Sequence, residues 1–291
     1  TNRYQRQAFV PGQPLNVPPP AGDTAYERND ACMIAHGQLT SGAIYEAFVW
    51  TEADYDYYYV DVTDSGIFEA ILLETVTDAT YELCLYQSNA QLIRCENTYG
   101  EGAAHVIRNG LPAGRYYLLV KSSYGSSQTS RYHLQAFIPG QPLQVPPPTG
   151  DTTYERNDAF MIAHGPLNSG ATYEAFIWTE ADYDYYYTDI GSGGIFEAIL
   201  TEAVPDATYD LCLYRSDAQR VICDNTYGDD PARIVRSDLT PGRYYLLVTS
   251  SYGASQTTRY RLQVFGPPPP TATPTPTVTP TAPRTPPPTL A

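Results

Sequence analysis

The sequence is a tandem repeat of one domain-sized unit. Shifted by 128 residues, so that Tyr26 falls on Tyr154, the chain aligns with itself without a gap. About two positions in three are then identical, and a unit of this length is a whole domain rather than a short solenoid repeat. We therefore predict two equivalent domains, at residues 23–137 and 151–265.

The segments outside the two units carry signals of their own. Residues 10–22 and 138–150 are proline-rich linkers, and residues 266–291 form a Pro/Thr-rich stretch typical of an extended polyproline-like stalk. The threonines of this stalk are candidate O-glycosylation sites, or the stalk is a bare spacer. Residues 1–9 match the last strand of the unit and predict the closing strand of an upstream copy. The simpler interpretation is that a longer array is truncated there, because each unit already has its own closing strand. Alternatively, this strand completes a sandwich across a subunit or domain boundary.

Short strand signals punctuated by Gly and Pro fill each unit. In the first unit the candidate strands are residues 43–50, 56–62, 67–73, 81–87, 91–97, 106–108, 115–121 and 131–137. About eight short strands without an amphipathic helix predict an all-β chain, with two tandem β-sandwiches of Greek-key or jelly-roll type. Tyr116 and Tyr244 each follow a Gly-Arg pair and resemble a tyrosine corner, in which the hydroxyl bonds back to the preceding loop.

The cysteines predict one disulfide in each unit. If Ser88 faces Gln91 across a hairpin turn, Cys84 lies directly opposite Cys95, where a disulfide can form. Cys212 and Cys223 repeat this spacing, and such bonds indicate an oxidising compartment. Two reduced thiols are the alternative. Cys32 has no counterpart, because Phe160 stands at the equivalent position, so we expect it to be a free, buried, hydrophobic side chain.

Acidic residues gather at two places in each unit. In the first unit they are Glu27, Asn29 and Asp30, preceded by Asp23, and then Asp54 and Asp56. Carboxylates on alternate residues at the start of a strand can converge from one side, and hard oxygen ligands of this kind suit Ca²⁺. Alternatively, these side chains only solvate loops and cap turns.

The order of these motifs resembles the bacterial pre-peptidase C-terminal domain, a family that includes the collagen-binding domains of clostridial collagenases. The resemblance rests on Glu-x-Asn-Asp, Asp-x-Asp-Tyr-Tyr, Leu-Cys-Leu-Tyr and Gly-Arg-Tyr-Tyr-Leu-Leu-Val, and it covers nearly all of both units. It implies a secreted, non-catalytic, often calcium-binding β-sandwich. By position, it implies calcium ligands at Glu27, Asn29, Asp30, Asp54, Asp56, Glu155, Asn157, Asp158, Asp182 and Asp184.

Two departures from that pattern bear on the metal site. Collagen-binding members carry a further Glu two residues before the motif, where this chain has Ala25 and Thr153. Asp23 and Asp151 are possible substitutes, and otherwise the site is weaker. Arg28 and Arg156 also replace a Pro that is frequent inside the motif.

Tyrosines are abundant, with 27 in the chain, and some are candidates for ligand binding. A run of three tyrosines in a strand must divide between its two faces, and tyrosines in Ser-Ser-Tyr-Gly loops are expected to be exposed. Exposed tyrosines stack on sugar rings or grip a collagen-like polymer, whereas most tyrosines of a sandwich simply pack in it. The candidates for surface binding are Tyr57, Tyr59, Tyr124, Tyr185, Tyr187 and Tyr252.

Charge and motifs exclude several classes of function. A net charge of −15 repels nucleic acids and anionic membranes, and no apolar run is long enough for membrane insertion. The sequence has no nucleophile elbow, zinc-protease helix, phosphate loop or dinucleotide fingerprint. His105 and His133 become Arg233 and Arg261 in the second unit, so neither supports a duplicated catalytic site. We therefore expect no enzymatic activity.

These observations predict a secreted, extracellular or cell-surface bacterial protein with a structural role. Near-identical units, linkers of fixed length and the extra strand suit a segment of an extracellular fibre, whose partners are further copies or neighbouring repeats. The alternative is a targeting module that attaches a secreted hydrolase to a polysaccharide or collagen-like polymer.

Overall fold

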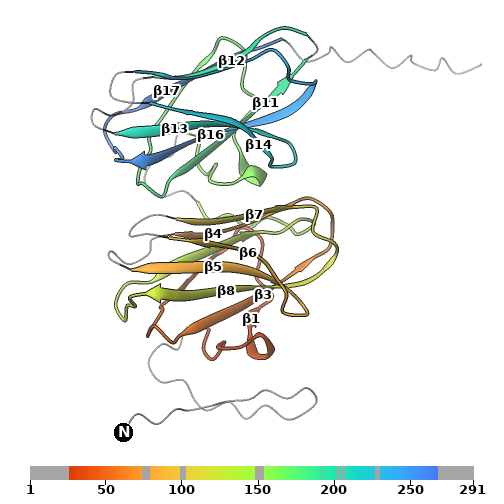
Figure 1. Cartoon of the computed structure of the whole chain (residues 1–291), viewed down its shortest axis with the longest axis vertical. Helices are drawn as coiled ribbons and strands as arrows, with labels where there is room; N and C mark the ends of the chain where they lie inside the picture. Colours follow the sequence, from red (N-terminus) through yellow and green to blue (C-terminus); the bar gives the residue numbers. More distant parts are fainter. Residues whose placement is uncertain are drawn as a thin grey trace, which may run out of the picture.

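The computed structural model describes residues 26–73, 79–98, 103–147, 154–191, 193–201, 204, 207–226 and 230–267. The predicted closing strand at residues 1–9, the first linker and nearly all of the stalk lie outside these residues, so those predictions stay untested. Within the described residues the prediction of an all-β fold is confirmed: two β-sandwiches follow one another along the chain (Figure 1). We call them copy 1 and copy 2.

Copy 1 contains nine strands and one short 3-10 helix in its described residues. They are η1 (Cys32–Ile34), β1 (His36–Gly37), β2 (Ile44–Ala47), β3 (Tyr55–Val62), β4 (Ile67–Leu73), β5 (Thr80–Gln87), β6 (Leu92–Asn97), β7 (Ala104–Asn109), β8 (Gly114–Tyr124) and β9 (Tyr132–Phe137). One sheet has the order β1-β3-β8-β5-β6 and the other β2-β9-β4-β7. Sequence reasoning missed η1 and β1, because each is too short to show a periodic pattern.

Copy 2 repeats this arrangement. Its elements are η2 (Phe160–Ile162), β10 (Thr172–Ala175), β11 (Tyr183–Ile190), β12 (Phe196–Thr201), β13 (Thr208–Arg215), β14 (Arg220–Asn225), β15 (Ala232–Arg236), β16 (Gly242–Tyr252) and β17 (Tyr260–Phe265). The sheets have the orders β11-β16-β13-β14 and β10-β17-β12-β15. An isolated parallel bridge between His164 and Tyr186 stands where copy 1 has β1.

Buried and outward-pointing side chains alternate along the strands, and the buried ones form the core of each copy. In β3, Asp56, Tyr58, Val60 and Val62 are buried between the sheets, while Tyr57 and Tyr59 point outward. Apolar side chains at every second position of a half-buried strand are what a two-layer sandwich requires. The tyrosine corners are confirmed as well: the Tyr116 hydroxyl donates to the Pro112 carbonyl at 2.9 Å, and the Tyr244 hydroxyl donates to the Thr240 carbonyl at 3.0 Å.

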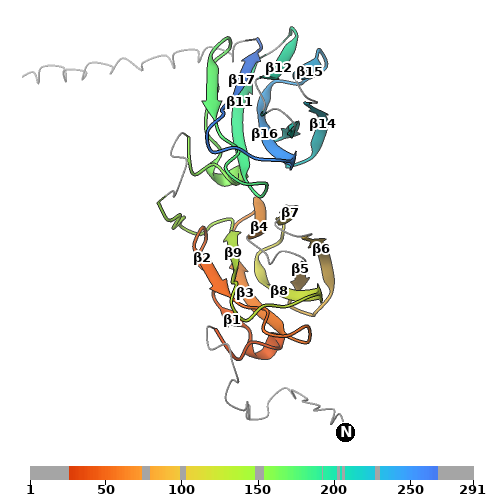
Figure 2. The ribbon, with the colours of Figure 1, turned by 90° about the vertical axis from the view of Figure 1, so that its left-hand side faces the viewer.

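The two copies stack sheet against sheet. The outer face of β2-β9-β4-β7 in copy 1 meets η2 and the outer face of β11-β16-β13-β14 in copy 2 (Figures 1 and 2). Phe160 is the centre of this contact, packed on Tyr185 with ring centroids 4.6 Å apart and in one apolar cluster with Ile67 and Ile107 of copy 1. The four sheets therefore form four successive layers along the long axis.

A buried carboxylate ties the two copies together. Glu69 of β4 is fully buried; its Oε2 accepts a hydrogen bond from the Phe160 backbone N–H at 2.9 Å, and its Oε1 lies 2.5 Å from His105 Nε2. A buried carboxylate is costly unless it is paired and hydrogen-bonded, and here both conditions are met. This contact therefore selects one geometry for the stack.

Candidate metal centre

A strained turn positions the first acidic residue. Tyr26, directly before Glu27, has a φ of 65°, a conformation that costs a non-glycine residue of the order of 1 kcal/mol. Aromatic packing holds it there, since the Tyr26 ring lies 4.4 Å from the His36 ring and 5.7 Å from the Tyr45 ring, centroid to centroid. Tyr154 repeats the conformation in copy 2 with a φ of 68°. The turn places the glutamate beside the first residues of β3 or β11.

The start of β3 supplies two more carboxylates. Asp54 is buried and its Oδ2 accepts a hydrogen bond from the Trp50 backbone N–H at 2.7 Å. Asp56 is buried as well, and its Oδ2 accepts a hydrogen bond from the Tyr132 hydroxyl at 2.7 Å. One carboxylate oxygen from each of Glu27, Asp54 and Asp56 lies within 4.8 Å of the others. Strand alternation thus turns two aspartates and a loop glutamate toward one point.

Copy 2 builds the same group from Glu155, Asp182 and Asp184. Asp182 Oδ2 accepts a hydrogen bond from the Trp178 N–H at 2.6 Å, and Asp184 Oδ2 accepts one from the Tyr260 hydroxyl at 2.5 Å. The other oxygen of Asp184, Oδ1, is buried and has no hydrogen-bond partner in the part of the chain that the structure describes. The Tyr260 hydroxyl therefore orients Asp184 through Oδ2, and the Asn157 amide lies close enough to the same carboxyl to lower its pKa.

A buried amide accompanies each carboxylate group. Asn29 and Asn157 are 1% and 0% exposed, and within the described residues neither the amide nitrogen nor the amide oxygen of either side chain has a hydrogen-bond partner. The Asn29 amide lies close enough to Asp56 to lower the pKa of that carboxyl, but at a geometry that leaves the amide atoms unpaired. Buried amides are ordinarily hydrogen-bonded, so two equivalent exceptions beside two equivalent carboxylate groups need a reason.

The aspartates resist ionisation without a counter-charge. Burial raises the pKa of Asp56 well above its usual range, and the charges of Asp54 and Glu27 raise it further. Burial likewise raises the pKa of Asp184, with Asp182 and Glu155 adding to the effect. A divalent cation would stabilise the ionised form of these carboxylates. Together with the amide oxygen they offer only oxygen ligands, which Ca²⁺ prefers.

The remaining two proposed ligands lie outside the carboxylate groups. Asp30 forms an ion pair with Arg28, with Nη1 and Oδ2 3.6 Å apart. Burial beside the copy 1 surface raises the pKa of Asp158, while the Arg156 charge lowers it. Sequence reasoning overlooked Tyr132 and Tyr260, which orient the central aspartates. The alternation of the closing strand places both on the core side, but it does not indicate their hydrogen bonds.

The two predicted disulfides and the predicted free cysteine are confirmed. Cys84 bonds Cys95 and Cys212 bonds Cys223, with Cα–Cα distances of 4.0 and 4.1 Å. Cys32 is free and half-buried rather than fully buried. The predicted turn is wrong in detail: Gln87, not Ser88, faces Gln91. Ala90 adopts a left-handed φ of 63°, and a register shift between Leu85 and Tyr86 restores the pairing of the cysteines.

The candidate binding tyrosines have four different environments. Tyr124 and Tyr252 are each 66% exposed at equivalent positions, whereas Tyr57 is half-buried on the outer face of β3. Tyr59 and Tyr187 lie under the guanidinium groups of Arg115 and Arg243, each 3.9 Å from the ring centroid. The prediction of surface binding is wrong for Tyr185, which is fully buried because Phe160 and copy 1 cover it.

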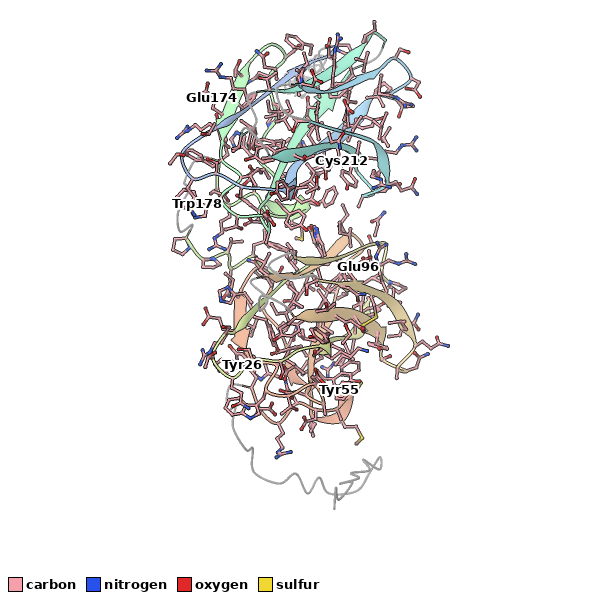
Figure 3. All side chains as sticks on the ribbon, turned by 60° about the vertical axis from the view of Figure 1, so that its left-hand side comes forward. Tyr26, Tyr55, Glu96, Glu174, Trp178 and Cys212 are labelled. Carbon is pink, nitrogen blue, oxygen red and sulfur yellow. A yellow bond between two sulfur atoms is a disulfide. The ribbon has the colours of Figure 1, made fainter. Side chains whose placement is uncertain are left out.

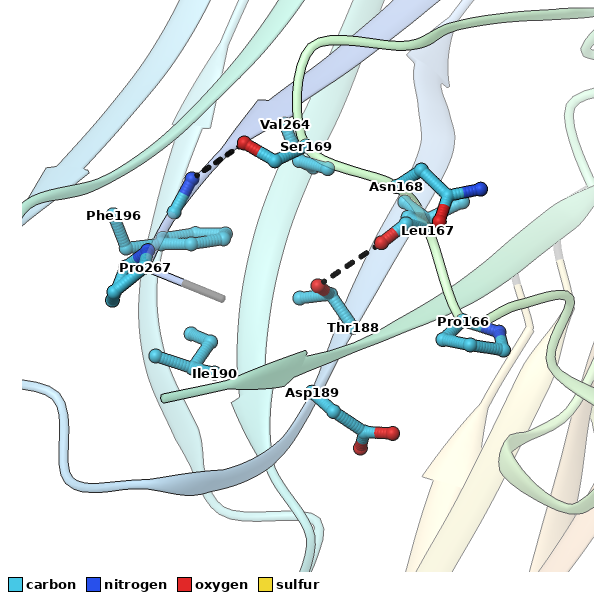
Figure 4. A pocket seen from close by; sticks show the side chains of 11 residues that line it. Pro166, Leu167, Asn168, Ser169, Thr188, Asp189, Ile190, Phe196, Val264 and Pro267 are labelled. Carbon is cyan, nitrogen blue, oxygen red and sulfur yellow. Dashed lines mark hydrogen bonds between the residues drawn. The ribbon is translucent and has the colours of Figure 1, made fainter. Parts of the chain in front are cut away.

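One hollow of about 260 Å³ lies at the end of copy 2 (Figure 4). Leu167, Ile190, Phe196 and Val264 give it an apolar lining, and Gly266 contributes no side chain. In copy 1 the residue equivalent to Gly266 is Ile138, which is fully buried. Part of the hollow is therefore the space that a missing side chain leaves. Its polar lining residues Ser169 and Thr188 form hydrogen bonds with the backbone of Gly266 and Leu167 (Figure 4).

Comparisons with known proteins assign no family. No protein-family model matches the chain, and no curated protein matches it. A solved pre-peptidase C-terminal domain of a collagenase from Bacillus anthracis is similar, with 16% identity over 34% of this chain and 90% of that chain at a TM-score of 0.28. The exported protein XepA of PBSX is similar at 10% identity over 78% of this chain and 88% of that chain, with a TM-score of 0.25.

A third solved structure contains the M60 catalytic domain with the CBM51-1 and CBM51-2 domains of Clostridium perfringens ZmpB. It is 9% identical over 74% of this chain and 33% of that chain, at a TM-score of 0.25. Because all three TM-scores lie below 0.5, these similarities assign neither family nor function. None of the helices among the described residues has the length and hydrophobicity needed to cross a bilayer.

Proposed function

We propose that the chain is a non-catalytic, secreted structural protein whose tandem sandwiches stack into a stiff segment of an extracellular array. The observation that carries this proposal is the sheet-to-sheet contact between the copies, with Phe160 and Glu69 buried at its centre. Domains that only share a tether have no need to bury a hydrogen-bonded carboxylate between them. Two disulfides support a location outside the cell, where such bonds persist.

Calcium belongs to this proposal as a stabiliser of each sandwich. Glu27, Asp54, Asp56 and the Asn29 amide oxygen would hold the ion in copy 1. Glu155, Asp182, Asp184 and Asn157 would hold it in copy 2. The bound ion would neutralise carboxylates that otherwise repel one another and would fix the loop before η1 or η2 to the start of β3 or β11.

Immunogold labelling of the native cells tests the structural role. We expect label along regular surface structures outside the cell. In solution, small-angle scattering of the intact chain should fit one elongated body rather than two freely jointed spheres. Label confined to the cytoplasm, or scattering typical of independent domains, would contradict the proposal.

A targeting module is the second candidate, and the exposed Tyr124 and Tyr252 favour it. They lie at the same position in each copy, so they would present two equal contacts one repeat apart to a regular polymer. A pull-down on insoluble polysaccharides and on collagen tests it, with Tyr124→Ala/Tyr252→Ala as the matched variant. Retention that the double variant loses would establish this role, and no retention of the intact chain would remove it.

A further inference from the structure

Two outer faces of the stack have no partner within the described residues. The acceptor face is the outer side of β10-β17-β12-β15 and carries Ile195, Glu197, Ile199, Val235 and Phe265. The donor face is the outer side of β1-β3-β8-β5-β6 together with η1, and it carries Cys32, Met33, Tyr55, Tyr57 and Tyr117. They lie at opposite ends of the long axis (Figure 1), and Tyr55 is labelled on the lower end of copy 1 in Figure 3.

Each face is the repeat equivalent of one side of the contact inside the chain. The acceptor face corresponds to the copy 1 surface of Ile67, Glu69, Ile71, Ile107 and Phe137, which copy 2 covers. The donor face corresponds to the copy 2 surface of Phe160, Met161, Tyr183, Tyr185 and Tyr245, which copy 1 covers. The chain thus shows, within itself, how a donor face docks on an acceptor face.

Residues that the internal contact covers are less exposed than their equivalents on the two uncovered faces. Phe137 is 0% exposed in the internal contact, whereas Phe265 is 38% exposed. Ile195 and Val235 are 62% and 49% exposed, and at the other end Met33 and Tyr55 are 44% and 43% exposed. Large apolar side chains gathered on one face mark an interaction surface more often than a solvated one.

The two uncovered faces also carry the groups that form the hydrogen bond at the centre of the internal contact. Inside the chain a backbone N–H of η2 donates to Glu69, so the identity of the donating side chain does not matter. Glu197 stands in the position of Glu69, and η1 offers the backbone N–H of Cys32. A second copy can therefore form this bond without any new residue.

We propose that a second copy of this chain docks its donor face on the acceptor face, so that the chains join end to end by repeating their own internal contact. This inference rests on the proposed structural function and names its partner. The two faces differ, so the contact is heterologous and leaves a free face at each end of any oligomer. Such a contact generates an open filament rather than a closed dimer.

Several substitutions make the joint between chains weaker than the joint within the chain. Thr201 of the acceptor face replaces Leu73, which packs in the internal contact. Cys32 replaces the Phe160 ring, and Arg233 replaces His105 beside the central glutamate. Arg233 Nε lies 2.5 Å from Glu197 Oε1, and its exposed side chain must be covered on docking. Association is therefore reversible and dependent on concentration, whereas the internal stack is held by covalent linkage.

Face-blocking variants test the joint by analytical ultracentrifugation. Ile195→Glu/Val235→Glu blocks the acceptor face, and Met33→Glu/Tyr55→Glu blocks the donor face. All four side chains are exposed, so the sandwiches should fold, which circular dichroism and thermal melting check. Tyr252→Glu is the control, because it replaces an equally exposed apolar residue outside both faces.

The intact chain and the control should form oligomers beyond the dimer as concentration rises. Each blocked variant alone should stay monomeric, and an equimolar mixture of the two should form a one-to-one dimer of twice the monomer mass. Dimerisation of the donor-blocked variant alone would show pairing of like faces and overturn the proposal. A strictly monomeric intact chain, as when its own terminal segments cover a face, would overturn it too. A rigid stack within that monomer would leave the proposed function standing.

Discussion

Replacing Phe160 by Ala should loosen the contact between the two copies. The Phe160 ring is almost fully buried, with ring centroids 4.6 Å from Tyr185, 4.9 Å from Tyr245 and 5.6 Å from Tyr214. These three rings belong to copy 2, while Ile67 and Ile107 of copy 1 complete the apolar surroundings. Truncation to Ala therefore opens a cavity between the copies and leaves the backbone N–H that bonds Glu69 in place.

The cost follows from that burial. Removing a buried Phe side chain costs about 3–5 kcal/mol, and about 3 kcal/mol is expected here because the copies can partly close the gap. At about 2.1 cal/mol/K of unfolding entropy per residue, this lowers the melting temperature by about 12 °C if copy 2 unfolds alone. The decrease is about 6 °C if both copies unfold as one unit, because twice the chain then shares the loss.

Differential scanning calorimetry measures the effect, and the repeat provides a matched control. Cys32→Ala changes the equivalent position of copy 1, where the side chain is half-exposed in the single chain; the melts are recorded at a dilution at which the chains are monomeric. Its cost should stay within about 0.5 kcal/mol. A Phe160→Ala melt within one degree of the unmodified chain, or equal shifts for the two variants, would refute a stabilising contact between the copies.

Further predictions concern the metal, the disulfides and the joint between chains. Addition of EDTA should lower the melting temperature by about 11 °C, since an ion at 100 times its Kd contributes about 2.7 kcal/mol to each copy. Asp56→Ala with Asp184→Ala should abolish the difference between EDTA and Ca²⁺, and an unchanged melt of the parent chain in EDTA argues against the site. Reduction of Cys84–Cys95 and of Cys212–Cys223 should lower the free energy of unfolding of each copy by about 3 kcal/mol, because each bond closes a loop with a sequence separation of 11. Urea unfolding measures this loss, and an unchanged unfolding midpoint would show that the disulfides do not stabilise the copies. Cys32→Phe should tighten end-to-end association about 30-fold by sedimentation, as burying the ring contributes about 2 kcal/mol; equal or weaker association would show that this position lies outside the joint.

Local patterns in the sequence were sufficient to predict that each copy is an all-β sandwich. The alternation around Tyr58, the spacing of Cys84 and Cys95, and the Gly-Arg-Tyr motif at Tyr116 all act between neighbours in one hairpin or one loop. Such interactions depend on residue order and strand geometry, so they can be derived from the sequence. The repeat then transfers every such conclusion from one copy to the other.

What the tertiary structure decided involves residues distant in the chain. Gln135 belongs to the polar side of an alternating strand, yet it is 1% exposed and its Nε2 donates to the Gly42 carbonyl at 2.7 Å. Tyr57 and Tyr185 occupy equivalent positions and differ because only the second faces another copy. The convergence of Glu27 with Asp54 and Asp56 likewise follows from how a loop meets the start of a strand more than 25 residues later in the chain. The sequence alone determined which face of each strand is apolar. Whether an outer face is buried depends on the surface that packs against it, and only the stacking of the two copies decided which outer faces are covered.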